Sequence, residues 1–366
     1  MDEIAGTEII LKNELFQAKI IPGIGGNVVS LRHLETGSRL LREPDRPEDL
    51  KQFPEQFGIP VLFPPNRIED GRFVFEGREC RLPVNEPAMR NHLHGLAVGK
   101  PWKLLYADRD AAELQFKFSA RDPEFEGFPF TFTLKRRIEL TPSGLRDSMT
   151  VTNHGEWNMP LGLGYHTTFP APLRMRVGTD DRQIEIGERY LPTGKLTEWQ
   201  EFDPRSWFDP QGRNIGFHAR AKDLTGEDGS SLHGAELLYA DGLLRYITDR
   251  KISFWYTWNR RGNADFVSIE PVSWMANALN QKDALPANVR KLAAGEEITF
   301  SNELIFYPGK AGDVTSGREK SPQMPMILLQ TADLEPPELQ LIAHAFQRGE
   351  RTLDRRGDGN ARRHGA

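Results

Sequence analysis

The stretch DFVSIEPVSW, from Asp265 to Trp274, has the alternating pattern of a β-strand. Successive side chains of a strand point to opposite faces, so Phe266 and Glu270 share one face and the apolar residues between them occupy the other. A carboxylate in such a strand costs free energy unless it has a partner. Two explanations follow: a buried structural ion pair with an arginine, or a catalytic base in apolar surroundings.

Similar alternating segments continue almost to residue 308, separated by Gly, Pro, Asn and Asp. They are FQAKIIP, RFVFEG, ELQFKFSA, FTFTLKRRIEL, RDSMTVTNH, LRYITD, ISFWYTW and EITFSNELIFYP. The sequence shows no solenoid or propeller repeat, and no alternation of strands with crossover helices. We therefore predict an all-β fold, a large antiparallel β-sandwich whose sheets pack face to face.

The pattern changes after residue 309. We assign residues 1–309 to the sandwich domain and residues 310–350 to a C-terminal extension. The segment EPPELQLIAHAFQRGE has apolar residues at helical spacing between Pro337 and Gly349, which predicts a helix over 337–348. The charged, glycine-containing stretch 351–366 is predicted to be a disordered tail.

Composition excludes several classes of partner. The chain has 366 residues, 38% apolar and 27% charged, with a net charge of −5, the balance of a globular protein. A strong basic field is absent, which argues against nucleic acid or an anionic membrane as partner. No window approaches the roughly 18 apolar residues of a membrane span, and no secretory signal is visible. With Cys80 as its one cysteine, the chain is predicted to be soluble and cytoplasmic.

Polar residues gather in three short segments: NRIEDG with Arg67, NHLHG with His92 and His94, and LGLGYH with His166. A His-x-His pair is compatible with half of a metal site. Nothing in the spacing supplies the remaining ligands, and HExxH, CxxC and calcium-loop motifs are absent. We predict no metal.

Motifs for covalent or nucleotide chemistry are also missing. The chain has no GxSxG, no GxxxxGK[ST] and no GxGxxG that opens a helix. The remaining inward glutamate, histidines and arginine are the parts of acid–base chemistry without a cofactor.

Taken in order, these segments resemble the aldose 1-epimerase (galactose mutarotase) family over roughly residues 8 to 308. The similarity lies in the opening ELFQAKIIPGIGGNVVSLRHLETGSRLL, then NRIEDGRFVFEG, NHLHG followed by Trp102, GYHTTF, VSIEP and KLAAGEEITF. The resemblance implies the galactose mutarotase-like β-supersandwich, with a sugar bound in an open groove across one sheet.

The same resemblance implies a role for each matching residue. Glu270 would be the general base, His166 the general acid and His94 a second histidine at the sugar ring. His92 falls on a variable position. Arg67 would bind hydroxyl groups of the sugar. Asn91 and Asp241 are further candidates for substrate binding, and Trp255, from ISFWYTW, is a candidate for an apolar surface against the sugar. Trp255 is also a candidate for the sandwich core, and Asp241 and His233 are alternatives for the family's hydroxyl-binding aspartate, which has no clear counterpart here.

The implied reaction interconverts the α and β anomers of an aldose. A base removes the proton of the C1 hydroxyl while an acid protonates the ring oxygen. We expect the two groups to face each other across a space the width of a pyranose. One alternative is a hexose-6-phosphate 1-epimerase, with Arg72, Arg90 and Lys100 as phosphate-binding candidates. Another is a sugar-binding or regulatory module without turnover. The sequence identifies neither the sugar nor the oligomeric state.

Overall fold

The computed structural model describes residues 8–122, 127–226, 229–260, 265–281 and 285–309. The chain divides into two units, Met1–Thr315 and Ser316–Ala366, and only the first contains described residues. The predicted extension, its helix over 337–348 and the predicted tail lie outside the described residues. No helix of the described part is long and apolar enough to cross a membrane.

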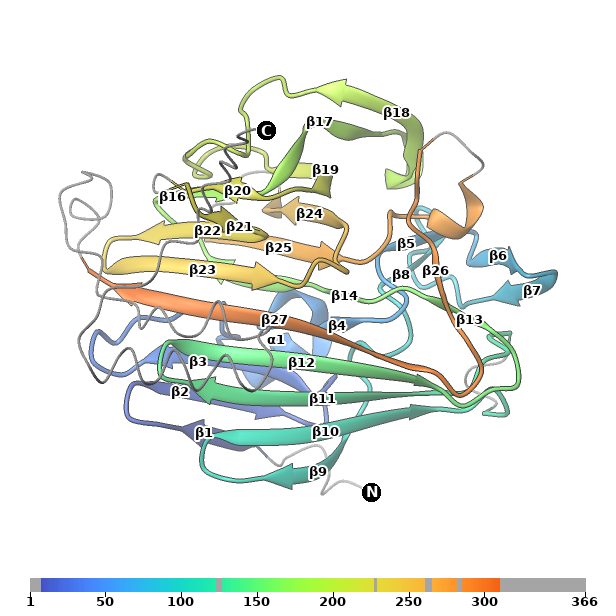
Figure 1. The fold of residues 1–366 in the computed structure, drawn as a ribbon, viewed down its shortest axis with the longest axis horizontal. Helices are drawn as coiled ribbons and strands as arrows, with labels where there is room; N and C mark the ends of the chain where they lie inside the picture. The colour runs from blue at the N-terminus through green and yellow to red at the C-terminus, as the bar shows by residue number, and fades with distance from the viewer. Residues whose placement is uncertain (1–7, 123–126, 227–228, 261–264, 282–284, 310–366) are drawn as a thin grey trace, which may run out of the picture. The chain divides into compact units, whose positions relative to one another are not determined.

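Eight antiparallel strands form the first large sheet, sheet I, in the order β16-β22-β23-β27-β12-β11-β10-β9. Figure 1 shows them stacked from β16 to β9. Their bounds are β16 Arg174–Val177, β22 Gly234–Tyr239, β23 Gly242–Thr248, β27 Glu297–Pro308, β12 Gly144–Asn153, β11 Phe132–Thr141, β10 Ala111–Phe118 and β9 Lys103–Ala107. The longer strands alternate buried and partly exposed residues, because one face covers the core.

The second large sheet, sheet II, has the order β18-β17-β19-β24-β25-β14-β4, and β15 also pairs with β25. Its strands are β18 Pro192–Glu198, β17 Thr179–Ile186, β19 Gly216–Ala221, β24 Phe254–Trp258, β25 Phe266–Val272, β14 Gly164–Tyr165, β15 Thr167–Pro170 and β4 Val61–Leu62. The alternating segment that carries Glu270 is thus strand β25, with β24 on one side and β14 and β15 on the other.

Smaller elements complete the described chain. Two- and three-stranded sheets are formed by β1 Ile9–Lys12, β2 Phe16–Ile21 and β3 Asn27–His33; β5 Arg67–Glu69 and β8 Asn91–Leu93; β6 Arg72–Phe75 and β7 Arg78–Arg81; β13 Met159–Leu161 and β26 Arg290–Leu292; and β20 Leu224–Thr225 and β21 Ser231–Leu232. The helices are α1 Pro47–Gln52 and the 3₁₀ turns η2 Pro54–Gln56, η4 Glu188–Tyr190 and η6 Ala278–Asn280.

Sheets I and II share one hydrophobic core. The ring of Tyr246 in sheet I lies 6.1 Å from that of Trp255 and 5.7 Å from that of Phe169, both in sheet II. The Tyr246 hydroxyl also lies 2.8 Å from that of Thr167. The prediction of an all-β, antiparallel sandwich is confirmed.

Strand β25 is buried on both of its faces. Val267 and Ile269 belong to the core between the sheets. Phe266 and Glu270 therefore point to the opposite side of sheet II, as the alternation predicts. This outer side carries its own smaller apolar cluster, which includes Phe254, Val272 and Trp274 and covers the end of β25.

Candidate active site

Sheet pairing brings Glu270 and His166 into contact. In β14 and β15, Gly164 pairs with Val272 and Thr167 with Ile269. His166 therefore lies beside Glu270, and the distance from His166 Nε2 to Glu270 Oε1 is 3.2 Å. Both residues are only 4% exposed. The glycine run before His166 is required here, because a Cβ on Gly162 would lie 2.2 Å from the Trp274 ring.

The expected spacing of a pyranose width between these two groups is wrong. They are in direct contact on one wall of the site. The physical reason is that His166 lies between β14 and β15, both paired with β25, at the level of Glu270, where side chains are close neighbours.

The Glu270 carboxylate is buried but not saturated. Ser268 Oγ donates a hydrogen bond to Oε1 at 3.1 Å. Oε2 has no hydrogen-bond partner among the described residues, and no described arginine forms an ion pair with this carboxylate. The explanation of Glu270 as half of a structural arginine pair is therefore wrong.

His94 is the second histidine at this wall. Its ring centroid lies 5.1 Å from that of His166, edge to face. Burial lowers the pKa of His94 well below its ordinary value, and the neighbouring His166 and Arg67 add to the effect, so the ring is neutral at pH 7. Its Nδ1 is buried and has no hydrogen-bond partner among the described residues. The next residue has to be a glycine, because a Cβ at Gly95 would lie 2.2 Å from the Phe63 carbonyl.

His92 points elsewhere. It lies within β8 opposite Ile68, and its Nδ1 lies 2.7 Å from the Pro83 carbonyl oxygen. Burial lowers its pKa to about 4. The two histidines of His-x-His thus have different neighbours. Within the described ranges, no three His, Cys, Asp or Glu side chains are grouped to hold a metal.

Arg67 and Asn91 lie on β5 and β8 and share one carboxylate. Arg67 donates to Glu86 through Nε at 2.9 Å and through Nη2 at 2.8 Å. Asn91 is fully buried, and its Nδ2 donates to Glu86 at 3.0 Å and to the Arg189 carbonyl at 2.9 Å. Arg67 is half-buried and its Nη1 has no acceptor among the described residues. The Asn91 side chain links β8 to Glu86 and to the turn that carries Arg189.

Tyr256 is a site residue that the sequence did not reveal. It is the cross-strand partner of Glu270, so both side chains leave the same face of sheet II. Its ring stacks on His218 at 3.6 Å, and its buried hydroxyl has no hydrogen-bond partner in the part of the chain that the structure describes. Burial raises the pKa of Tyr256 well above its ordinary value, with nearby Arg67 opposing and Glu270 reinforcing that shift.

Trp255 and Asp241 do not join the site. Trp255 points to the opposite face of β24 from Tyr256 and packs in the core between the sheets. Asp241 lies in the β22–β23 turn of sheet I, where Ser38 donates to its carboxylate. The prediction of either as a sugar-binding residue is corrected: one register step reverses the facing of Trp255, and Asp241 belongs to the other sheet. His233, the alternative for the aspartate, instead pairs with Asp223 at 2.9 Å.

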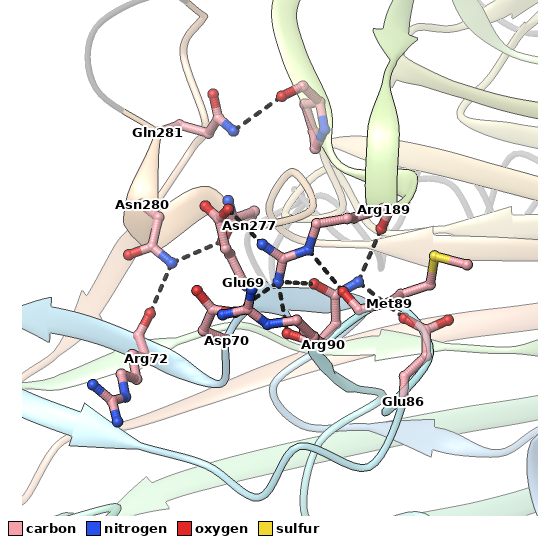
Figure 2. A network of polar contacts seen from close by, with 12 residues as sticks. Glu69, Asp70, Arg72, Glu86, Met89, Arg90, Arg189, Asn277, Asn280 and Gln281 are labelled. Atoms are coloured by element: carbon pink, nitrogen blue, oxygen red, sulfur yellow. Dashed lines mark hydrogen bonds and ion pairs between the residues drawn. The ribbon is translucent and has the colours of Figure 1, made fainter.

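Loops with polar side chains lie near the group formed by Glu270, His166 and His94. Figure 2 shows Arg189, from the turn between β17 and β18, among Glu69, Asp70 and the Met89 carbonyl. Asn277, beyond β25, donates through its backbone N–H to the Arg67 carbonyl at 2.8 Å. The loops that carry Arg67 and those that follow Glu270 are therefore tied to each other.

The candidate site contains three buried polar atoms that are available for hydrogen bonds. Glu270 Oε2, Tyr256 Oη and His94 Nδ1 have none among the described residues. Buried polar groups are normally hydrogen-bonded, so these three atoms are available to hydrogen-bond a ligand. A cavity of about 680 Å³ lies elsewhere, over β1–β3 and α1, and none of its lining residues belongs to this wall.

Comparisons with known proteins agree with this fold. The model of the family described as aldose 1-epimerase matches residues 7–299. An uncharacterized protein of Escherichia coli K12, YphB, is 23% identical over 248 residues, covering 65% of this chain and 80% of YphB.

Solved structures show the same likeness. A galactose mutarotase-like protein from Clostridium acetobutylicum superposes with a TM-score of 0.73 at 27% identity, over 82% of this chain and 95% of that one. A putative aldose 1-epimerase from Escherichia coli K12 has a TM-score of 0.69 at 19% identity, over 83% of this chain and 99% of that one.

Proposed function

The chain belongs to the aldose 1-epimerase family, and from this premise we propose that it interconverts the α and β anomers of an aldose without a cofactor. One observation carries the proposal: the buried Glu270 carboxylate contacts His166 and keeps Oε2 without a partner. The saturated structural pair of Arg136 with Asp147 uses both carboxylate oxygens. A general base needs one of them for its substrate.

Ring opening assigns one proton to each residue. Glu270 Oε2 takes the proton of the C1 hydroxyl, while His166 gives its Nε2 proton to the ring oxygen. The bond between C1 and the ring oxygen breaks, and C1 becomes an aldehyde. After rotation about C1–C2 the ring oxygen attacks the other face of C1. Its proton returns to His166, and the new C1 hydroxyl receives the proton held by Glu270.

Direct contact between acid and base suits this reaction. The C1 hydroxyl oxygen and the ring oxygen are bonded to the same carbon, so proton-transfer groups on one side of the sugar can reach both. An acid between β14 and β15 and a base on β25, 3.2 Å apart, can therefore reach the two oxygens together. Arg67 Nη1 and the Tyr256 hydroxyl would bind other hydroxyl groups of the same sugar.

Each positioned proton transfer contributes about 10²–10⁴-fold to the rate. Loss of either group should raise the barrier by about 3–5 kcal/mol, since each tenfold corresponds to about 1.4 kcal/mol. His94 is neutral, so it is suited to hydrogen bonding at the ring and not to donating the reaction's first proton.

The test is the decay of optical rotation of fresh α-D-glucose, α-D-galactose and a panel of other aldoses, free and 6-phosphorylated. The wild type should accelerate at least one of them above buffer, and Glu270→Gln should lose about 10²–10⁴ of that acceleration. A preference for phosphorylated sugars would shift the substrate to the hexose-6-phosphate class. Acceleration equal in wild type and variant would remove Glu270 from the mechanism.

A further inference from the structure

The turn between β17 and β18 has an unusual backbone. Arg189 has φ 62° and Tyr190 has φ 57°, two consecutive non-glycine residues in the left-handed region. Each such residue costs of order 1–3 kcal/mol and persists only where its surroundings enforce it. Seven of the ten described non-glycine residues with positive φ lie in the loops around Arg67: Asn66, Asp70, Arg90, His94, Arg189, Tyr190 and Asn277. Strain of this kind clusters at functional sites.

The hydrogen bonds of the Arg189 side chain hold the turn in this backbone conformation. Its Nε donates to the Met89 carbonyl at 2.7 Å and its Nη1 to Glu69 at 2.9 Å. Nη2 donates to Asp70 at 2.9 Å and to the Arg90 carbonyl at 2.7 Å. Figure 2 shows this guanidinium at the centre of the network. All three nitrogens of the guanidinium are engaged, so Arg189 itself has little left for a ligand.

Tyr190 follows Arg189 in this turn, and its ring is partly exposed. Its ring centroid lies 4.9 Å from the Arg67 guanidinium carbon, and the residue is 46% exposed. Arg67 is fixed along one edge by Glu86 and over one face by Tyr190. The accessible ring and Arg67 Nη1, which has no acceptor among the described residues, therefore form one surface, apolar beside polar, and Arg67 is near enough to His94 and Tyr256 to affect their pKa values.

We propose that Tyr190 is a substrate-binding residue, whose ring contacts the apolar C–H face of the sugar while Arg67 binds its hydroxyl groups. Arg189 is a positioning residue that holds Tyr190 in place. The proposal rests on the proposed function, because it takes the ligand to be a pyranose. A rigid aromatic surface beside fixed hydrogen-bond donors is suited to such an amphipathic ligand.

The first test replaces Tyr190. Tyr190→Ala should raise KM about tenfold with little change in kcat, because a contact made equally in ground and transition states affects binding alone. Tyr190→Phe keeps the ring and should keep the wild-type KM. The matched control is Trp157→Ala: Trp157 is also 46% exposed with the Arg78 guanidinium 3.7 Å from its ring, outside the site. It should leave KM unchanged.

The second test separates positioning from direct binding. Arg189→Lys should raise KM as Tyr190→Ala does, and the double variant should be no worse than Tyr190→Ala alone, because both act through one ring. Fully additive effects would overturn the positioning role. Should Arg189→Lys fail to fold, the three-way comparison of Tyr190→Ala, Tyr190→Phe and Trp157→Ala still decides the role of Tyr190.

A binding measurement separates this proposal from the catalytic one. Calorimetry with the sugar panel gives Kd for wild type and Tyr190→Ala independently of turnover. A Kd that weakens about tenfold supports the contact even for a protein that accelerates nothing. An equal Kd for the two proteins overturns it while leaving mutarotation intact. Absence of both binding and turnover for every sugar overturns both proposals.

Discussion

One buried carboxylate in each large sheet, Asp147 in sheet I and Glu270 in sheet II, can be compared, and their surroundings differ. Asp147 in sheet I accepts three hydrogen bonds from Arg136, which is fully buried and also donates to the Gly26 and Ile59 carbonyls. Glu270 in sheet II accepts from Ser268 and contacts His166, and its second oxygen is unpartnered. Both carboxylates lie in alternating strands with apolar neighbours.

This difference distinguishes a structural role from a functional role for a buried carboxylate. Arg136 and Asp147 satisfy each other, so they fix how sheet I packs and leave nothing for a ligand. The surroundings of Glu270 are incomplete. A buried group without its full set of partners costs stability, and it persists where a ligand or a reaction uses it.

The largest effect is expected from breaking the saturated pair. Arg136→Met leaves the Asp147 carboxylate buried and unpaired, and should lower the free energy of unfolding by about 3–5 kcal/mol. The double variant Arg136→Met, Asp147→Leu should recover most of that loss, because no uncompensated charge remains. Denaturant unfolding measures both. A loss below about 1 kcal/mol for Arg136→Met would mean that the pair is not structurally important.

The next effect concerns activity at the incomplete pair. His166→Gln should lower kcat by about 10²–10⁴-fold, because the ring oxygen loses its acid. The control is His233→Gln, whose histidine also pairs with a carboxylate, Asp223, at 2.9 Å but lies outside the site. Polarimetry should show normal turnover for the control. Equal activity in both variants would contradict the assignment of His166.

A smaller effect is expected from one hydroxyl. Tyr256→Phe keeps the ring stacked on His218 and removes the unpartnered Oη beside Glu270, so kcat/KM should fall by about tenfold. Tyr165→Phe is the matched control, because its hydroxyl is also buried and unpartnered but belongs to the core between the sheets. Loss of activity in the control but not in Tyr256→Phe would reverse the assignment of the two faces.

The smallest effect involves a third carboxylate, at the surface. Burial raises the pKa of Asp223, but hydrogen bonds from Ser231, Arg250 and His233 outweigh it and lower the pKa to about 2. A lowered folded-state pKa contributes stability above the ordinary value of 3.8, which is lost as pH falls through about 2.

Asp223→Asn should therefore reduce unfolding free energy by about 1 kcal/mol at pH 7, allowing for solvent screening. The difference from wild type should shrink between pH 4 and pH 2. Thermal unfolding across that range measures it, and a difference independent of pH would contradict the lowered pKa.

Much of the fold was predictable because it is local. The period of two in DFVSIEPVSW predicted which face carries Glu270, and the structure agrees. The glycine of NHLHG is explained by a backbone that excludes any Cβ at Gly95. Trp255 shows the limit of this reasoning, since ISFWYTW offers aromatic residues to both faces of its strand. Only the pairing with β25 assigns Tyr256, and not Trp255, to the face of Glu270.

The sequence by itself determined an antiparallel sandwich, because alternation and turn residues depend on neighbours a few positions apart. Similarity to known relatives selected Glu270, His166 and His94. The tertiary structure was needed to show that His166 contacts Glu270, that Asp241 belongs to sheet I, and that the Tyr190 ring lies against the Arg67 guanidinium. Those relations join residues that are distant in the chain, and they are set by strand order and register, which no local pattern encodes.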